Sequence, residues 1–219
     1  MAKESKVGDE GSTRQRILDA ALELFGQHGF SGTSMRMLAR ATSLRESSIY
    51  NHFSGKEDLY QSVMAQWGPA EFVERLKSAE YRALSDDPQG LFQLCGKDLI
   101  NRWLDPREKL FMAMTSKEGR GSKAREQLYK ALFREEIDLL GRYVAGFADA
   151  GLINAPDPRE TARIFCAGLT FTRMEHLMWT TKPSSRRMIT RAVEHYIENF
   201  LALITKPTTT DTANSSKKP

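Results

Sequence analysis

The sequence predicts an all-α protein, and its composition and helix-start signals are the observations behind that prediction. Leu and Ala form helices readily and number 43 of the 219 residues, whereas the β-branched Val and Ile, which favour strands, number 14. Three aspartate–proline pairs, at Asp87, Asp105 and Asp157, each place a capping acceptor before a proline at the first helical position. We therefore expect about nine helices and no strands.

The first predicted helix covers residues 12–28. Ser12 followed by Gln15 is a capping-box pattern, and apolar residues from Ile17 to Phe25 then recur at helical spacing. Gly29 is expected to end the helix, because glycine adopts the left-handed conformation of a helix C-terminus without steric cost.

Two short helices and a longer one follow. The second helix, over residues 34–41, is capped by Thr33 or Ser34, and a break at 42–44 separates it from a third helix over 45–53. Ser54, with Glu57 completing a capping box, begins a fourth helix that Gly68 and Pro69 end or kink. Further breaks are expected at 119–122, 151–157 and 182–185, and the last two helices cover 158–181 and 184–204.

The composition excludes several classes of protein. No stretch approaches 18 consecutive apolar residues, and the polar start of the chain lacks the apolar core of a secretion signal. Cys95 and Cys166 are too few for a disulfide framework or a cysteine-rich zinc site. The four histidines show no metal-ligand spacing, and no nucleophile or phosphate-binding motif is present. We expect a cytoplasmic protein that is not an enzyme and has no metal or other cofactor.

The chain divides into four parts by composition and periodicity. Residues 1–11 and 206–219 are polar and lack helical periodicity, so both ends are predicted to be disordered. Residues 12–57 form a three-helix, helix-turn-helix head, and residues 58–205 form a larger helical bundle.

The head has the dimensions and the side chains of a DNA-binding module. A nine-residue helix over 45–53 is about 13 Å long, and the major groove of DNA, roughly 12 Å wide, admits one helix. Ile49 and Phe53 lie four residues apart and point inward, and the polar residues of this helix can donate hydrogen bonds: Arg45, Ser47, Ser48, Asn51 and His52. From these residues alone, a small three-helix cap with a solvated polar face remains an alternative.

Particular residues of the head resemble the tetracycline-repressor (TetR) family of bacterial regulators. The matching runs are AALELF at 20–25, HGF at 28–30, TS at 33–34 and IYNHFSGKEDLY at 49–60. The resemblance covers about 55 residues, and the rest of the chain matches only in length and helix pattern. It implies a dimeric transcriptional regulator, most often a repressor that a small hydrophobic ligand releases from a palindromic double-stranded DNA operator.

The resemblance also assigns roles within the head. Thr33 matches a phosphate-contacting threonine, Tyr50 and His52 match a pair that reaches phosphates, and Lys56 matches a lysine at the start of the fourth helix. The full set of expected DNA-binding residues is Thr33, Ser34, Arg45, Ser47, Ser48, Tyr50, Asn51, His52 and Lys56. The alternatives are a core tyrosine at Tyr50 and a solvated histidine at His52.

The head departs from the family pattern at the turn. Ser43 stands where glycine is usual, which makes a left-handed turn less easily adopted. Arg45 replaces the usual N-cap serine of the third helix, so Ser43 could cap that helix from a shifted start. Glu46 could accept a hydrogen bond from cytosine or serve only as a first-turn carboxylate favoured by the helix dipole.

The resemblance implies that the bundle holds a small-molecule pocket and contributes to a four-helix dimer interface. The expected ligand-binding residues are Trp103, Phe111, Met114, Phe171, Glu175 and Met178. Glu175 stands out because a carboxylate on an apolar helix is costly unless it is paired. The expected homodimer interface comprises Ile189, Val193, Tyr196, Ile197, Phe200 and Ile204, which exceed what one stripe facing the bundle requires. Any one of these residues is also typical of a packed core.

A function of a different class is a helical effector-binding or scaffold protein whose head contacts protein rather than DNA. The two functions differ in their response to salt, because DNA binding releases counterions and weakens steeply as the salt concentration rises.

Overall fold

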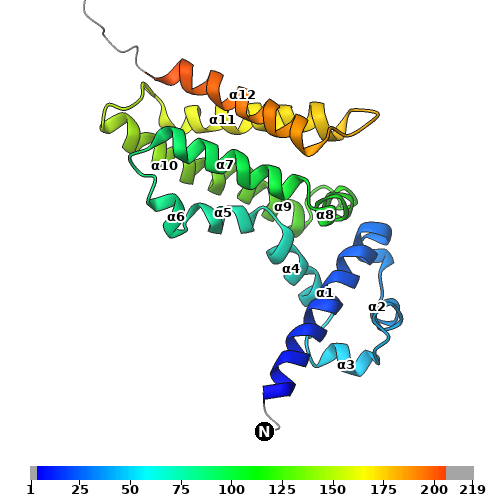
Figure 1. Ribbon diagram of the computed structural model, residues 1–219. Coiled ribbons are helices and arrows are strands. Elements are labelled where there is room, and N and C mark those ends of the chain that lie inside the picture. Colours follow the sequence, from blue (N-terminus) through cyan, green and yellow to red (C-terminus); the bar gives the residue numbers. More distant parts are fainter. Residues whose placement is uncertain (1–3, 206–219) are drawn as a thin grey trace, which may run out of the picture. The chain divides into compact units, whose positions relative to one another are not determined.

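The computed structural model describes residues 4–205, and this range contains helices and no strand (Figure 1), so the all-α prediction is confirmed. The α-helices are α1 (Glu4–Gly32), α2 (Met35–Thr42), α3 (Glu46–Tyr50), α4 (Lys56–Trp67), α5 (Ala70–Leu76), α6 (Ala79–Arg82), α7 (Pro88–Trp103), α8 (Pro106–Ser116), α9 (Lys123–Lys130), α10 (Glu136–Asp149), α11 (Pro158–Arg173) and α12 (Arg186–Ile204). Two π-helical segments, η1 (Ala131–Glu135) and η2 (Met174–Met178), continue α9 and α11. The described residues form more helices than the nine predicted, because α5 and α6 were not anticipated and η1 separates α9 from α10.

Helix α1 is longer than predicted at its start, and its path breaks at the predicted end, Gly29, before the last residues up to Gly32. It begins at Glu4, so the prediction of disorder is wrong for residues 4–11; Ser12 does not interrupt the helical backbone. The predicted disorder at 1–3 and 206–219 lies outside the described residues. Gly29 has a φ of 70° and a ψ of 174°, which breaks the helical path as the sequence indicated.

The connection between α2 and α3 corrects two expectations. Ser34 caps α2, with its side chain accepting a hydrogen bond from the Met37 N–H at 3.3 Å. Ser43 adopts the left-handed conformation (φ 56°, ψ 31°) and ends α2 instead of capping α3. The N-cap of α3 is Arg45, with no side-chain capping bond, and α3 is only five residues long before a turn at Asn51 and His52.

The three aspartate–proline helix starts form as predicted, whereas the capping box predicted at α4 does not. The carboxylates of Asp87, Asp105 and Asp157 accept backbone hydrogen bonds at 2.9, 2.8 and 2.9 Å, as the aspartate–proline pairs predict. At α4 the predicted pairing of Ser54 with Glu57 is absent, since the Ser54 N–H and hydroxyl both donate to Asp58, at 2.8 and 3.2 Å.

The described chain forms two compact units, and the division differs from the single predicted boundary at residue 57. The first unit combines residues up to Ser78 with residues 101–136. Its core joins α1, α2, α3 and α4 to two residues of α8, Phe111 and Met114. Helix α8 comes close to α1 at Gly26, where a Cβ atom would lie 3.1 Å from the carbonyl oxygen of Leu110. The head is therefore completed by residues far along the chain.

The second unit combines residues 79–100 with the chain from Ile137 onward. Its core contains a triad of rings from α7, α11 and α12: Phe92 lies 4.5 Å from Phe165 and 5.2 Å from Phe200, between ring centroids. Helices α11 and α12 lie side by side (Figure 1). Gly168 allows this approach, because a Cβ atom there would lie 2.2 Å from the ring of Tyr196.

Candidate nucleic-acid interface

Helix α3 has a buried apolar side and an exposed polar side. Ile49 and Phe53 are 0% and 2% exposed, and they anchor α3 in the core of the first unit. Tyr50 is 51% exposed, which excludes the core tyrosine that was the alternative at this position. Among the other predicted residues, Ser34, Arg45, Ser47 and Asn51 are exposed, and Ser48 and His52 are half-buried. Helix α3 therefore presents Tyr50 and its polar side chains to solvent, while its apolar side packs in the core.

Arginines of α1 and α2 and at the start of α3 supply positive charge to the head. Arg36 and Arg40 of α2 are exposed, as is Arg45 at the start of α3. From α1, the Arg14 guanidinium lies 4.9 Å from the centre of the Phe53 ring, and Arg16 donates a hydrogen bond to the Thr42 carbonyl at 2.9 Å. The sequence did not single out Arg14 and Arg16, because their partners, Phe53 and Thr42, follow them by more than twenty positions. Only the fold brings these residues together.

Thr33 occupies a different place from the one its predicted role requires. Its side chain is buried, with the residue only 2% exposed, and its hydroxyl donates to the carbonyls of Gly29 (2.9 Å) and Leu24 (3.2 Å). This hydroxyl closes the broken end of α1 and is not offered to a phosphate.

Lys56 likewise binds within the head. Its ammonium group donates to the carbonyls of Phe30 and Thr33, both at 2.8 Å, and lies 4.3 Å from the centre of the Phe30 ring. Two of its three hydrogens are therefore used to tie the first turn of α4 to the junction between α1 and α2. Glu46 is exposed in the first turn of α3, a position compatible with both roles that its sequence suggested.

The predicted ligand-binding residues are divided between the two units. Trp103, Phe111 and Met114 are buried in the first unit, where Phe111 and Met114 fill the core. Phe171 and Met178 belong to the second unit and are 69% and 50% exposed.

Glu175 lacks the buried setting that singled it out. Its side chain is 65% exposed, and its carboxylate lies 4.0 Å from the Nε2 atom of His176. The argument from the cost of burying a carboxylate is therefore wrong for Glu175.

The predicted dimer interface is also placed differently. Ile189, Val193, Ile197, Phe200 and Ile204 are at most 8% exposed, because this stripe of α12 packs inside the second unit. The Tyr196 hydroxyl donates to the carbonyls of Ile164 and Phe165, at 3.0 and 3.1 Å. The stripe is core of the protomer and does not form an external surface. Large apolar residues that are exposed on α11 and α12 are Ile164, Phe171, Met188 and Leu203.

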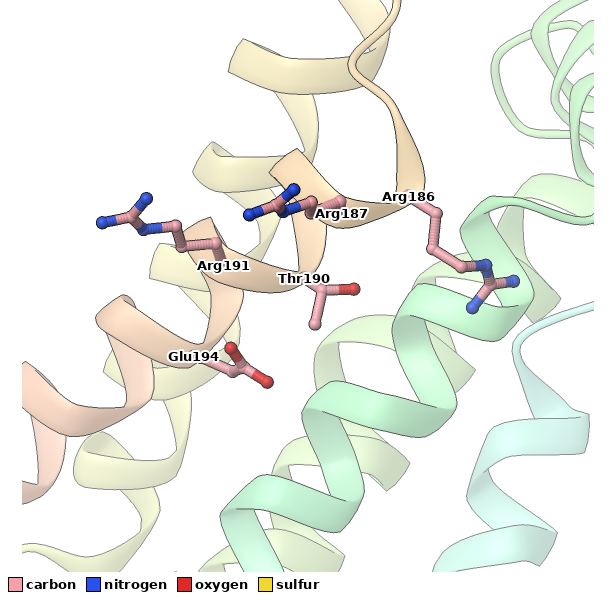
Figure 2. Close-up of a pocket in the computed structure, with 5 residues that line it drawn as sticks. All are labelled: Arg186, Arg187, Thr190, Arg191 and Glu194. Carbon is pink, nitrogen blue, oxygen red and sulfur yellow. The ribbon is translucent and has the colours of Figure 1, made fainter.

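An open hollow of about 720 Å³ lies along α12 and is lined by Arg186, Arg187, Thr190, Arg191 and Glu194. Figure 2 shows that the Arg186 guanidinium points away from those of Arg187 and Arg191. The cations do not converge, so the hollow does not form a defined anion site. No helix among residues 4–205 is long and apolar enough to cross a membrane.

Comparison with known proteins agrees with this geometry. Residues 17–63 match the family model described as bacterial regulatory proteins, tetR family. The chain is 43% identical over 63 residues to the HTH-type transcriptional regulator AcrR of Shigella flexneri, a match that spans 29% of each chain. The N-terminal segment is thus a tetR-family segment, as its motifs predicted, and the family consists of transcriptional regulators rather than enzymes.

Solved structures extend the likeness to most of the chain at the level of the fold. The complex of SmeT, the repressor of a Stenotrophomonas maltophilia multidrug efflux pump, with triclosan has a TM-score of 0.68 and 20% identity, and covers 95% of this chain and 98% of SmeT. NalD, the secondary repressor of the MexAB-OprM efflux pump in Pseudomonas aeruginosa, has a TM-score of 0.65 and 23% identity, and covers 91% of this chain and 99% of NalD.

Proposed function

We propose that this protein is a sequence-specific DNA-binding transcriptional regulator that places α3 in the major groove. The observation that carries the proposal is the division of α3 into buried anchors and exposed donors, with arginines of α1 and α2 beside it. Arg45, Ser47 and Asn51 are the exposed groups that can reach base edges or phosphates. Arg36 and Arg40 replace Thr33 and Lys56 as the candidates for phosphate contact.

We further propose that the regulator is a homodimeric repressor that a small hydrophobic molecule releases from a palindromic operator. The fold over most of the chain is shared with SmeT, which is a repressor and was solved with triclosan. The exposed apolar residues of α11 and α12, Ile164, Phe171, Met188 and Leu203, are the surface that a second copy would cover. A two-fold dimer requires half-sites one helical turn of DNA apart, roughly 34–36 Å, or a multiple of it.

Two exposed tyrosines provide a matched test of the α3 surface. Tyr50 is 51% exposed on α3 and Tyr129 is 54% exposed on α9. Genomic DNA fragments retained by the purified protein would be sequenced, and the selected site used in mobility-shift assays between about 50 and 200 mM salt. We expect steeply salt-dependent binding, weakened about tenfold or more by Tyr50→Ala and unchanged by Tyr129→Ala. A flat salt dependence, or equal effects of the two substitutions, would favour a head that binds protein.

A further inference from the structure

A basic surface lies where α8 is joined to α9 in the first unit. Residues 117–126 include four basic side chains and two acidic ones. The basic residues, which we call the basic patch, are all exposed: Lys117, Arg120, Lys123 and Arg125. A Cβ atom added at Gly119 or Gly121 would meet no other part of the chain within 4 Å, and both glycines are exposed. The tip of this connection is therefore open to solvent.

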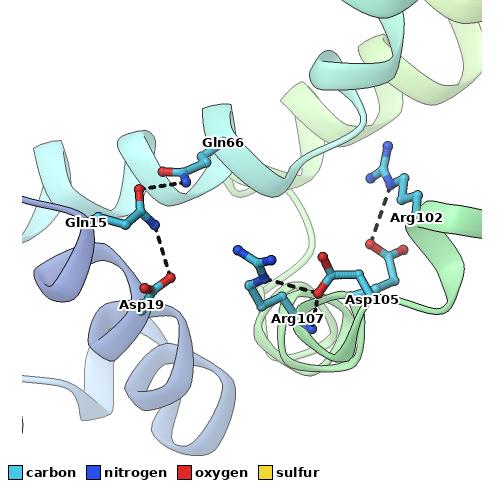
Figure 3. Close-up of polar contacts among 7 residues, drawn as sticks. Gln15, Asp19, Gln66, Arg102, Asp105 and Arg107 are labelled. Atoms are coloured by element: carbon cyan, nitrogen blue, oxygen red, sulfur yellow. Dashed lines mark hydrogen bonds and ion pairs between the residues drawn. The ribbon is translucent and has the colours of Figure 1, made fainter. Parts of the chain in front are cut away.

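Most of the basic patch is unpaired. Among residues 4–205, the side chains of Arg120, Lys123 and Arg125 make no hydrogen bond or ion pair. Arg107, in the first turn of α8, is by contrast paired with Asp105 at 3.1 Å (Figure 3). The basic patch can therefore bind an anionic partner without giving up an ion pair that the protein already has.

Two consecutive residues at the start of the connection attach it to the head. The Lys117 ammonium group donates a hydrogen bond to the carbonyl of Gly26 in α1, and a Cβ atom at Gly29 would lie 3.5 Å from the Lys117 side chain. Glu118 accepts a hydrogen bond from the Tyr60 hydroxyl of α4 at 2.7 Å. Because these contacts hold the connection to both α1 and α4, the basic patch stays beside the head.

These contacts bring the basic patch near the start of α2. The carbonyl of Gly29, which lies against Lys117, accepts the Thr33 hydroxyl at 2.9 Å, and Ser34 then caps α2. Arg36, in the first turn of α2, is exposed and is one of the residues proposed above to contact phosphate. Phosphates follow one another about every 3.4 Å along each strand of the double helix, so one DNA backbone can contact cations at both places.

We propose that the basic patch binds the phosphate backbone of DNA beside the stretch that α3 contacts, as a second and sequence-independent DNA contact outside the head helices. Phosphate contacts of this kind position a protein on the duplex and add affinity without reading bases. Residues 117–123 contain no apolar side chain, whereas interfaces between proteins have an apolar core, so DNA fits this surface better than an acidic protein does. The inference rests on the proposed function, because it requires that the head binds DNA.

A matched pair of double variants tests the inference on the full chain. Arg120→Gln with Lys123→Gln removes two cations from the basic patch, and Lys97→Gln with Arg142→Gln removes two from exposed positions of α7 and α10 in the second unit. Affinity for the operator selected by the purified protein would be measured by mobility shift between about 50 and 200 mM salt. We expect the slope of log affinity against log salt concentration to become less steep by about 0.9 for each phosphate contact that the first variant loses, and to stay unchanged in the second.

Footprinting locates the lost contacts on the DNA. With hydroxyl radicals, the parent chain should protect backbone positions next to those that the α3 surface protects, and Arg120→Gln with Lys123→Gln should lose this additional protection alone. The preferred operator sequence should not change, because phosphate contacts carry no base information. Arg120→Lys with Lys123→Arg, which keeps both charges, should bind as the parent chain does.

The outcomes separate this inference from the proposed function. Specific DNA binding with an unchanged salt slope in the basic-patch variant, an equal change in the second-unit variant, or an altered operator preference would overturn the inference alone. A parent chain that binds no DNA would overturn the proposed function and this inference with it.

Discussion

The ammonium group of Lys56 lies at a junction of three helices, where it donates hydrogen bonds to two backbone carbonyls. Those carbonyls belong to Phe30 and Thr33, which follow the break in α1 at Gly29, and the Phe30 carbonyl also accepts the Thr33 N–H at 3.3 Å. A charged donor on the first turn of α4 thus fixes the angle at which α4 leaves the head.

Replacing Lys56 should therefore affect stability before it affects DNA binding. We expect Lys56→Met to reduce the free energy of unfolding by about 2–3 kcal/mol, because two charge-assisted hydrogen bonds are lost at a half-buried position. Urea unfolding in the absence of DNA measures the change, with Arg45→Met at an exposed position as the control. Unchanged stability with weakened DNA binding would show that Lys56 acts on phosphate after all.

Ser43 carries a conformational cost that glycine would remove. It has a φ of 56°, the only positive value outside glycine among residues 4–205. We expect Ser43→Gly to raise the free energy of unfolding by about 0.5–1 kcal/mol and Ser43→Val to lower it, since a β-branched residue resists this conformation most. Ser47→Gly, within α3, should instead destabilise. A loss of stability in Ser43→Gly would mean that the serine side chain contributes an interaction of its own.

At the scale of elements, α12 illustrates how one tyrosine fastens two helices. The Tyr196 hydroxyl donates to two carbonyls of α11, and its ring lies on Gly168. Burial, followed by the neighbouring Cys166, raises the pKa of Tyr196 to about 12, above the ordinary value of about 10. The neutral hydroxyl is the form that the packed helices favour.

This raised pKa predicts a pH dependence of stability. The stabilisation is complete below pH 10, where the tyrosine is protonated in both states, and is lost as the pH rises through about 12. We expect the stability difference between the parent chain and Tyr196→Phe to favour the parent at pH 8 and to shrink between about pH 10 and 12. Chemical unfolding across this range measures it. Burial also raises the pKa of Tyr60 and Tyr81, but both are present in the two proteins and cancel in the comparison. A constant difference would therefore contradict the role given to Tyr196.

At the scale of the whole molecule, we expect substitution by glutamate to have different effects on the buried side and on the exposed side of α12. Ile197 is 2% exposed and Leu203 is 84% exposed. We expect Ile197→Glu to unfold the second unit, because a carboxylate would be buried among apolar side chains. Leu203→Glu should leave the protomer folded and weaken the dimer.

Analytical ultracentrifugation and circular dichroism together distinguish these outcomes. The parent chain should sediment as a dimer and Leu203→Glu as a mixture enriched in monomer, with its helical signal intact and its operator affinity reduced. A parent chain that is monomeric at micromolar concentration would contradict the proposed assembly. A folded, monomeric Ile197→Glu would restore the interface first predicted from the sequence.

Some expectations that depend on neighbours along the chain were met, although the helix starts predicted at Ser12 and Ser54 were not. Asp105 and Asp157 cap their helices, Gly29 ends the helical path of α1, and Ile49 with Phe53 anchors α3, because each of these effects needs only residues three or four positions away. The same locality made the head recognisable, and the tetR-family match at residues 17–63 agrees with it.

The helical fold, the aspartate–proline helix starts and the family of the head segment could be predicted from the sequence alone, whereas packing settled what each surface faces. An apolar stripe indicates that one side of α12 is buried, but it does not tell whether α7 and α11 or a second chain packs against it. In the structure, this side packs in the core of the second unit. A lysine in a basic segment suggests contact with a DNA phosphate. The Lys56 ammonium group instead donates hydrogen bonds to backbone carbonyls 26 and 23 residues earlier in the chain. Periodicity and motifs carry information about short separations, and partners at long separation are set only when the chain is packed.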